Sequence, residues 1–261
     1  MKPNLPLIMG ILNITPDSFS DGGLYNSIKS AKKRAKEMEK EGVDIIDIGA
    51  ESTGPGSKKV KEDEELKRII PILKEIRKST KLPISIDTYK AKVAEECLKE
   101  GANIINDISA LRGDKRMAKV VSKYKCPIII MYSKDKTPHA TIKNKSYKNL
   151  PKTINDFLRQ RIQYAEKNGI KRKNIIIDPG MGNYISSNPK YSYEILAKLS
   201  EFKIHKMPIM LGLSRKSFLG SEIKDRDEKA LPLTTIAYLN GASIIRTHDI
   251  KGVKKLLKSL N

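Results

Sequence analysis

The sequence is poor in cysteine, histidine and large aromatic residues, and these shortages exclude several classes of protein. Its 261 residues include two cysteines, three histidines, four phenylalanines and no tryptophan. Cys97 and Cys126 form no CxxC pair and no metal-binding spacing, so they are predicted to be core thiols in a reducing compartment. No run of about 18 apolar residues is present, so no membrane-spanning helix is expected. The N-terminus lacks a small-residue cleavage site, and we expect a mature cytoplasmic start.

Positive charge is in clear excess over negative charge. The chain carries 51 Lys and Arg against 30 Asp and Glu, a formal net charge of +21. Such a balance can indicate a nucleic-acid partner, which would require one continuous basic face. Here the lysines are spread along predicted helices and mixed with glutamates, with no basic tail. The pattern therefore favours a solvated surface whose field attracts small anionic substrates, and it argues against a nucleic-acid partner.

Short apolar, β-branched runs alternate with longer helical patterns eight times along the chain. Eight such units in about 250 residues predict a (β/α)8 TIM barrel, with residues 1–261 as one domain. A doubly wound open sheet is the alternative, but no glycine-rich phosphate fingerprint follows the first run. The predicted strands are Leu7–Ile14, Asp44–Gly49, Pro83–Asp87, Asn103–Asp107, Pro127–Met131, Asn174–Asp178, Pro208–Leu213 and Ser243–Asp249. The predicted helices are Ser27–Glu41, Asp63–Ser79, Ala91–Glu100, Lys115–Lys123, Leu150–Asn168, Tyr191–Glu201, Leu231–Leu239 and Lys251–Leu260.

Polar residues follow most of these apolar runs. In a barrel the carboxyl ends of the strands converge on one pocket, so these side chains should meet there. A single Asp after a strand is more often a turn former, but this explanation fits one position better than it fits nearly all of them. The strand-end residues are Asn13, Glu51 with Thr53, Asp87, Asn106, Met131, Asp178, Ser214 with Lys216, and Arg246 with His248.

The strand-end residues predict a ligand with both N–H donors and negative charge. Asp87, Asp178 and Asn106 offer acceptors that suit a 2-amino-4-oxopyrimidine edge, and Lys216 can donate to a ring carbonyl or nitrogen. Arg246 and His248 are two apart on one strand, so they project the same way, and Arg suits a phosphate or diphosphate. A structural ion pair for Arg246 and a satisfied structural role for His248 are the alternatives.

Two loops have features of ligand contact. The segment GLSRKSFLG places Ser217 at a strand-to-helix junction, where free backbone N–H groups could bind an anion. The alternative is an ordinary serine cap between solvated basic residues. The segment ESTGPGS combines the Thr53 hydroxyl with Gly54 and Gly56, which allow close backbone approach. By itself that second segment indicates only a turn.

Six segments, in order along nearly the whole chain, resemble the dihydropteroate synthases, a family of pterin-binding (β/α)8 barrels. They are MGILNITPDSFSDGG, DIIDIGAESTGPGS, PISIDTYKAKVAEECLKEGANIINDIS, IIIDPGMG, LGLSRKSFLG and GASIIRTHD. The resemblance implies a transferase of folate biosynthesis that joins 6-hydroxymethyl-7,8-dihydropterin diphosphate to p-aminobenzoate and releases pyrophosphate. It also implies a homodimer.

The resemblance further implies roles for individual residues. The pterin would contact Asp87, Asn106, Met131, Asp178 and Lys216. Asn13 would hold Mg²⁺, and the diphosphate would contact Asn13, Thr53, Arg246 and His248. The arylamine would lie near Asp17, Phe19, Thr53, Pro55 and Ser217, with Asp17 and Phe19 in a closing first loop. Asp87, Lys216, Arg246 and His248 form the expected catalytic set.

The chain departs from the family pattern on the arylamine side. Gly54 stands where the family has Arg, and Asn183 stands where it has an aromatic wall, with Tyr184 next to it as a possible substitute. A family lysine after Asp178 is absent, and Tyr132 replaces an expected His. An altered second substrate, or methyl transfer on a reduced pterin, is therefore the alternative function. A methyl carrier needs no diphosphate site, so Asn13 and the Arg246–His248 pair argue against it.

Overall fold

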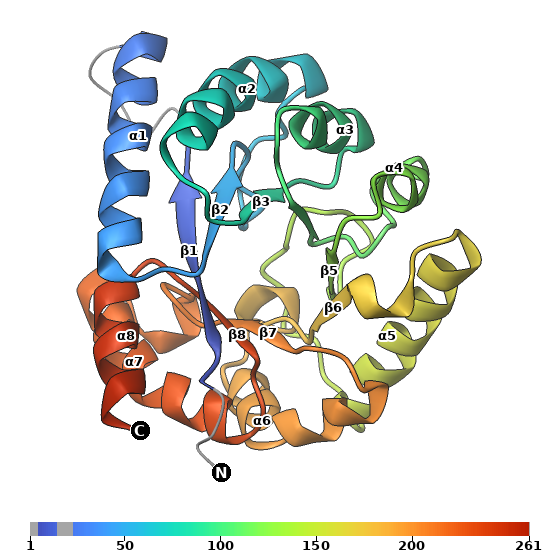
Figure 1. Cartoon of the computed structure of the whole chain (residues 1–261). Helices are drawn as coiled ribbons and strands as arrows, with labels where there is room; N and C mark the ends of the chain where they lie inside the picture. Colours follow the sequence, from blue (N-terminus) through green and yellow to red (C-terminus); the bar gives the residue numbers. More distant parts are fainter. Residues whose placement is uncertain (1–4, 15–22, 261) are drawn as a thin grey trace.

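Eight parallel strands form the centre of the molecule, and helices surround them (Figure 1). The computed structural model describes residues 5–14 and 23–260. Hydrogen-bonded neighbours run in the order β6-β5-β4-β3-β2-β1-β8-β7. A parallel bridge between Ile177 and Ile209, with Ile177 N donating to Pro208 O at 3.0 Å, brings β6 to β7 and nearly closes the barrel. The predicted (β/α)8 barrel is confirmed, and the open-sheet alternative is wrong.

The strands and helices alternate as predicted. The strands are β1 (Leu7–Asn13), β2 (Ile45–Gly49), β3 (Ile84–Asp87), β4 (Ile104–Asp107), β5 (Ile128–Met131), β6 (Ile175–Asp178), β7 (Met210–Gly212) and β8 (Ile244–Thr247). The helices are α1 (Gly23–Glu41), α2 (Glu62–Ser79), α3 (Ala91–Lys99), α4 (Met117–Tyr124), α5 (Leu150–Lys167), α6 (Lys190–Ala197), α7 (Ile223–Leu239) and α8 (Ile250–Ser259). In the described part of the chain no helix is long and apolar enough to cross a membrane.

Two helices differ from the prediction. Helix α7 begins at Ile223, eight residues before the expected start, and contains Pro232. Its first half, KDRDEK, shows no apolar periodicity, although most of its residues favour a helix, so periodicity could not reveal it. Helix α6 ends at Ala197, and the 3-10 segment η4 (Leu199–His205) continues the predicted helix in a tighter winding. Because β7 ends at Gly212 and α7 begins at Ile223, the side chains of Ser214, Lys216 and Ser217 lie on the segment between the two.

The interior of the barrel is arranged in layers that set the position of the pocket. One apolar cluster takes one residue from each of six strands: Met9, Ile45, Ile104, Ile129, Met210 and Ile244. Side chains two positions apart on a strand point to the same face, so the next inward layer lies two residues further on. That layer contains Asp47, Asn106, Met131 and Arg246, and it faces the carboxyl ends of the strands. Most of the other buried apolar side chains form a second cluster that packs the barrel against its helices.

Candidate active site

A cavity of about 520 Å³ lies at the carboxyl ends of the strands. It brings together residues that are far apart in the sequence but share a strand-end position. Among the predicted site residues, those that line it are Asn13, Thr53, Pro55, Asp87, Asn106, Met131, Asp178, Lys216, Ser217, Arg246 and His248. Asp17 and Phe19 lie outside the described residues. A cavity of this volume suits a small organic substrate rather than a macromolecule.

Arg246 lies at the centre of the cavity floor, between two carboxylates. Its Nε donates to Asp47 Oδ2 at 2.7 Å, and its Nη2 donates to Asp87 Oδ2 at 2.7 Å. Asp47 is fully buried on β2. The structural ion pair considered as the alternative for Arg246 is thus present. These bonds use Nε and Nη2, so Nη1 remains available to donate to a ligand in the cavity, and pairing does not exclude ligand binding.

Asp47 was missed by sequence reasoning, although a signal for it was present. It lies inside the apolar run of β2, two residues after Ile45, which belongs to the inner apolar cluster. A charged residue at an inward-facing strand position is rarely fully buried unless it is paired. The spacing from Ile45 therefore pointed to an inward carboxylate in need of a cationic partner, and Arg246 supplies it.

Burial perturbs the titration of the acids and of the lysine in the cavity. Burial raises the pKa of Asp87 to about 7, although the Arg246 guanidinium opposes this shift. Burial also raises the pKa of Asp178 to about 6. The pKa of Lys216 is lowered to about 8 by burial and then by the charge of Arg246. The pKa values of these three groups therefore lie near neutral pH, and pKa values perturbed in this way are common at binding and catalytic sites.

Acceptor atoms on the floor are left without partners. Asn106 Nδ2 donates to Asp47 Oδ2 at 3.3 Å, while Asn106 Oδ1 and Asp47 Oδ1 are buried with no hydrogen-bond partner among the described residues. Asp178 Oδ1 accepts from Gly180 N at 2.7 Å. Leaving a buried acceptor unpaired costs about 1–3 kcal/mol. The floor is therefore complementary to a ligand that brings N–H donors.

His248 contacts Ser214, which lies two residues after the end of β7. Its Nδ1 lies 3.0 Å from Ser214 Oγ, and its backbone N donates to the same oxygen at 3.2 Å. Burial, and next the positive charge of Arg215, lower the pKa of His248 to about 3. The imidazole is therefore neutral at neutral pH. The satisfied histidine considered as an alternative is present, and its ring also lines the cavity.

The upper wall of the cavity is made by loops that follow β2, β5 and β6. Thr53 Oγ1 lies 2.7 Å from Tyr184 Oη, and Thr53 O accepts from Ala140 N at 2.9 Å. Asn183 Nδ2 donates to Ser217 Oγ at 3.3 Å. Ser217 lies in a single 3-10 turn, η5 (Ser217–Leu219), because α7 begins only at Ile223. The junction after β7 at Ser217 is therefore a 3-10 turn rather than the start of a longer helix, and the anion site expected there stays a prediction.

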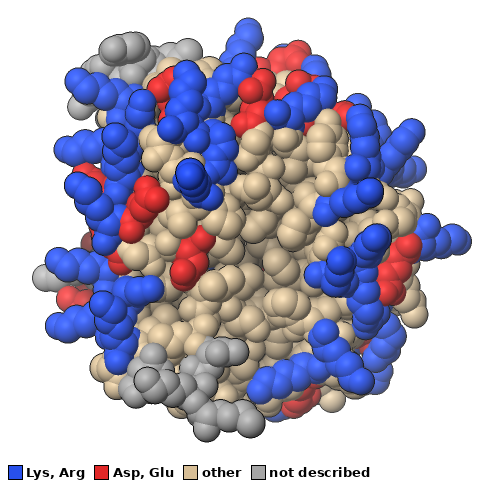
Figure 2. Space-filling model, in the orientation of Figure 1, with Lys and Arg blue, Asp and Glu red and all other residues tan. Residues whose placement is uncertain are grey.

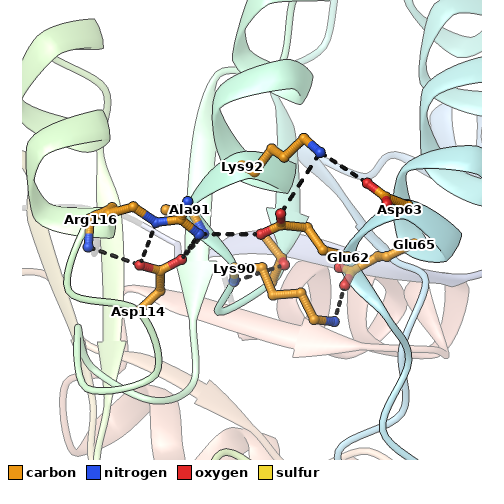
Figure 3. Close-up of polar contacts among 9 residues, drawn as sticks. Glu62, Asp63, Glu65, Lys90, Ala91, Lys92, Asp114 and Arg116 are labelled. Atoms are coloured by element: carbon orange, nitrogen blue, oxygen red, sulfur yellow. Dashed lines mark hydrogen bonds and ion pairs between the residues drawn. The ribbon is translucent and has the colours of Figure 1, made fainter.

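Glu51 connects the loops that follow β2, β3 and β5. Its carboxylate accepts from Val60 N at 3.0 Å and Tyr89 Oη at 3.1 Å, and its Oε1 lies 3.2 Å from His139 Nε2. It also pairs with Lys90, whose ammonium bridges to Glu65 on α2. Figure 3 shows Lys90 directed at Glu65, and Lys92 directed at Glu62 and Asp63 on the same helix. Glu51 therefore holds the start of the β2 loop.

Asn13 ends β1, and its side chain is exposed at the cavity. Its Oδ1 lies near Gly49, the last residue of β2, and near Asp87. Asn13 Oδ1 and the Asp87 side chain each lie within 4 Å of the position that a Cβ on Gly49 would occupy. In the described part of the chain no group of three or more His, Cys, Asp or Glu could hold a metal. One amide oxygen is a fitting ligand for Mg²⁺, which often keeps several waters and takes its other ligands from phosphate oxygens.

Charge on the outer surface is distributed rather than concentrated. On the face shown in Figure 2, Lys and Arg side chains lie mainly around the periphery with Asp and Glu among them, and the middle is largely uncharged. Many of the lysines form exposed ion pairs, such as Lys78 with Glu75 and Lys99 with Glu96. This face thus has no continuous basic surface of the kind that duplex binding uses.

Comparison with known proteins identifies relatives over almost the whole chain. The model of the family described as pterin binding enzyme matches residues 9–248. A dihydropteroate synthase from Clostridium beijerinckii is 44% identical over 248 residues, which is 93% of this chain and 88% of the relative. A dihydropteroate synthase from Clostridium difficile, solved in the presence of pteroic acid, has a TM-score of 0.91 and 41% identity and covers 98% of this chain and 96% of its own. One from Xanthomonas albilineans, solved with 4-aminobenzoic acid, has a TM-score of 0.91, 32% identity and coverages of 98% and 92%.

Proposed function

The chain belongs to the family of pterin-binding enzymes, and from that premise we propose that it catalyses the dihydropteroate synthase reaction. In this reaction 6-hydroxymethyl-7,8-dihydropterin diphosphate condenses with p-aminobenzoate, and 7,8-dihydropteroate and pyrophosphate are released. The enzyme is a transferase of folate biosynthesis. The observation that carries the proposal is a cavity floor with unpartnered acceptors next to an arginine and a lysine.

The pterin is proposed to bind on the floor of the cavity. Asp87, Asp178 and the free carbonyl oxygen of Asn106 would accept from its N–H groups, and Lys216 would donate to its ring oxygen or nitrogen. Met131 would pack against the flat ring face. Because the two carboxyl groups are buried, their hydrogen bonds to the pterin are stronger than they would be in water.

The diphosphate is proposed to lie against Arg246 and His248. Arg246 is held rigidly by its two carboxylates, so its Nη1 can stabilise the charge that grows on the leaving oxygen without reorganising. His248 is neutral, and its Nδ1 lies 3.0 Å from Ser214 Oγ; in the tautomer that accepts from Ser214 at Nδ1, Nε2 would carry the proton and donate a hydrogen bond to the diphosphate. Thr53 would contribute its hydroxyl at the edge of this subsite.

Mg²⁺ is proposed as the cofactor, with Asn13 as its protein ligand. When bound, the ion would neutralise charge on the diphosphate and so aid its departure. Asn13 would fix the outer end of the diphosphate relative to Arg246. Chelation by EDTA is expected to abolish turnover, and added Mg²⁺ is expected to restore it.

The arylamine is proposed to approach the reacting CH₂ group from the upper wall of the cavity. Thr53, Pro55 and Ser217 line that side, and the resemblance adds Asp17 and Phe19. The bond to the diphosphate breaks, the amine nitrogen then attacks the carbon, and the amine gives up one proton to the departing pyrophosphate or to solvent, so no nucleophile from the enzyme is needed. Gly54 and Asn183 alter this side relative to the family pattern, which favours a related arylamine as the second candidate substrate.

Turnover by the purified protein tests the proposed function. Pyrophosphate release is measured with the pterin diphosphate, Mg²⁺ and a panel of arylamines that includes p-aminobenzoate. Release with p-aminobenzoate is expected. Pterin diphosphate binding without release for any amine of the panel would contradict the synthase reaction, and the absence of pterin binding would contradict the site itself.

Two variants test the floor directly. Asp87→Ala and Lys216→Ala should each lose pterin affinity by about tenfold or more, since each removes a charge-assisted hydrogen bond worth ~1.5–3 kcal/mol. Asp63→Ala is the control, because Asp63 is an exposed carboxylate on α2. Unchanged affinity in both floor variants would refute the pocket assignment.

A homodimer in the cytoplasm is also proposed. The family resemblance implies the dimer, and exposed apolar side chains on the neighbouring segments α6, η4 and α7 support it: Tyr193, Ile204, Ile236 and Leu239. Light scattering should give twice the monomer mass, and Leu239→Lys should give the monomer, whereas Ile142→Lys on the β5 loop should not. A monomeric native protein would refute the dimer.

The free thiols of Cys97 and Cys126 suit a reducing compartment, which cell fractionation would check.

A further inference from the structure

Tyr184 joins two walls of the cavity that are far apart in the sequence. It ends the 3-10 turn η3 (Gly182–Tyr184) after β6, and its hydroxyl lies 2.7 Å from Oγ1 of Thr53, which follows β2. The two residues are 131 positions apart, and both line the cavity. Burial raises the pKa of Tyr184 to about 12, so its hydroxyl stays protonated at neutral pH. The contact is thus a neutral hydrogen bond across the cavity wall.

The ring of Tyr184 also contacts the lysine of the floor. Lys216 Nζ lies 4.8 Å from the ring centroid, within the range of a cation–π interaction. Tyr184 therefore stands between the pterin end of the cavity, at Lys216, and the loop that carries Thr53 and Pro55. A flat aromatic molecule entering between these two regions would meet the tyrosine ring.

The backbone around Tyr184 is held by the β5 loop. Lys134 N donates to Tyr184 O at 2.8 Å, and Lys134 Nζ donates to Asn183 O at 2.7 Å. The Lys134 side chain is only 2% exposed and also pairs with Asp135 at 2.7 Å. Because Thr53 O accepts from Ala140 of the same loop, both partners of the hydroxyl contact rest on one support. The position of Tyr184 is therefore fixed before any ligand arrives.

Tyr184 is the one Phe, Tyr or Trp side chain among the described residues that line the cavity. Asn183 is used in a hydrogen bond to Ser217 at 3.3 Å. Among the described residues, a Cβ on Gly54 would meet only Ser52 Oγ, at 3.6 Å, and Gly54 itself adds no side chain to the wall between Thr53 and Pro55. An arylamine needs a flat apolar surface and a polar edge, and Tyr184 with Thr53 offers both.

We propose that Tyr184 determines the specificity for the arylamine: its ring, held by the hydroxyl contact to Thr53, forms the wall against which the second substrate stacks. The inference rests on the proposed synthase reaction and extends it to a residue for which the sequence suggested only a possible substitution. Tyr184 acts on the second substrate, so its loss should change the KM for the arylamine far more than the KM for the pterin diphosphate.

Steady-state kinetics with both substrates tests the proposal. Tyr184→Phe keeps the ring and loses one neutral hydrogen bond, so the KM for p-aminobenzoate should rise about three- to tenfold, with kcat and the pterin diphosphate KM within about twofold. Tyr184→Ala also removes the ring and should raise the arylamine KM further. Tyr193→Phe, at an exposed position of α6 outside the cavity lining, is the matched control and should leave all constants unchanged.

A double-variant cycle separates the contact from general structural damage. Thr53→Val and Tyr184→Phe should raise the arylamine KM by similar factors, and the double variant should be no worse than the poorer single variant. An unchanged arylamine KM in both Tyr184 variants would refute the proposal. So would an equal rise of the KM for both substrates, because that would indicate a merely structural role.

Measurements on the unmodified protein distinguish failure of the proposed function from failure of this inference. If it binds the pterin diphosphate but does not turn over, calorimetry of p-aminobenzoate binding to that complex replaces the kinetics. A weaker affinity in Tyr184→Phe would then support the inference without the synthase reaction. Equal affinity in the two proteins, or no binding to either, would overturn it.

Discussion

Replacing Lys90 with Met should destabilise the protein much more than the same change at Lys92, two residues away. The Lys90 side chain is 8% exposed and pairs with Glu51 and Glu65, whose side chains are 3% and 1% exposed. The Lys92 side chain is 47% exposed and pairs with Asp63, which is 79% exposed. Figure 3 shows both lysines against the same stretch of α2. The two substitutions are chemically identical and differ in burial.

The expected size of the effect follows from what remains after the lysine is removed. Lys90→Met leaves two buried carboxylates without their cation, which costs about 3–5 kcal/mol. For a chain of this length each kcal/mol lowers Tm by about 2–4 °C, so a fall of about 6–20 °C is expected. Lys92→Met removes an exposed pair and should cost no more than about 1 kcal/mol.

The pH dependence of the loss checks its cause. Burial already raises the pKa of Glu65, and without Lys90 the pKa should rise further. A carboxyl group whose folded-state pKa is raised destabilises the fold increasingly as pH rises through that pKa. The stability gap between Lys90→Met and the unmodified protein should therefore narrow as pH falls from 8 to 5.

Urea denaturation followed by circular dichroism at several pH values supplies the measurement. Adding Glu65→Gln to Lys90→Met should recover part of the lost stability, because one unpaired charge is removed. Equal midpoints for Lys90→Met and Lys92→Met would refute the reasoning. A gap that stays constant with pH would show that the loss comes from packing instead.

Two further predictions concern the cavity. Pterin binding at pH 6.5 should release protons. The pKa values of Asp87 and Asp178 are raised to about 7 and about 6, and N–H donors of the pterin favour the ionised forms of both groups. Calorimetry in buffers of different ionisation enthalpy should detect the release. Affinity should also fall above about pH 8, where Lys216 loses its proton, so a flat profile from pH 6 to 9 would contradict these assignments. Gly180→Ala should weaken pterin binding and lower Tm, since its φ is +75° and a Cβ would meet a backbone carbonyl oxygen at 2.5 Å. Gly56→Ala, at φ +78° with no atom of the described residues within 4 Å of its Cβ, carries the conformational cost alone and should be clearly milder; the reverse order would be inconsistent with the packing around β6.

The barrel and the composition of its pocket could be predicted from the sequence because both depend on local patterns. Apolar runs of strand length recur between helical patterns, and a polar residue after a strand faces the same end of the barrel wherever the strand lies. Asp87, Asp178 and Arg246 were therefore assigned to one pocket although the chain separates them widely. The charged first half of α7 lacked such a pattern, and its helix was missed.

Contacts between loops could not be predicted in this way. The sequence indicates Tyr184 only as a possible substitute for the aromatic wall at Asn183, and the contact of Tyr184 with Thr53 depends on how the β2, β5 and β6 loops pack against one another. Asp47 was overlooked because its role depends on Arg246, 199 residues further along the chain. The residues around Asp47 do not indicate that Arg246 is its partner, and the residues around Arg246 do not indicate Asp47.

The sequence by itself thus determined the strand–helix alternation and the polar residues at the strand ends, since side-chain direction and hydrophobic periodicity are properties of neighbouring residues. Only the tertiary structure decided which acceptors stay unpaired, which carboxylates share Arg246 and how far the pKa values of Asp87 and Lys216 shift. Those properties arise from burial and from charges brought within a few ångströms, and these distances exist only once the barrel has nearly closed.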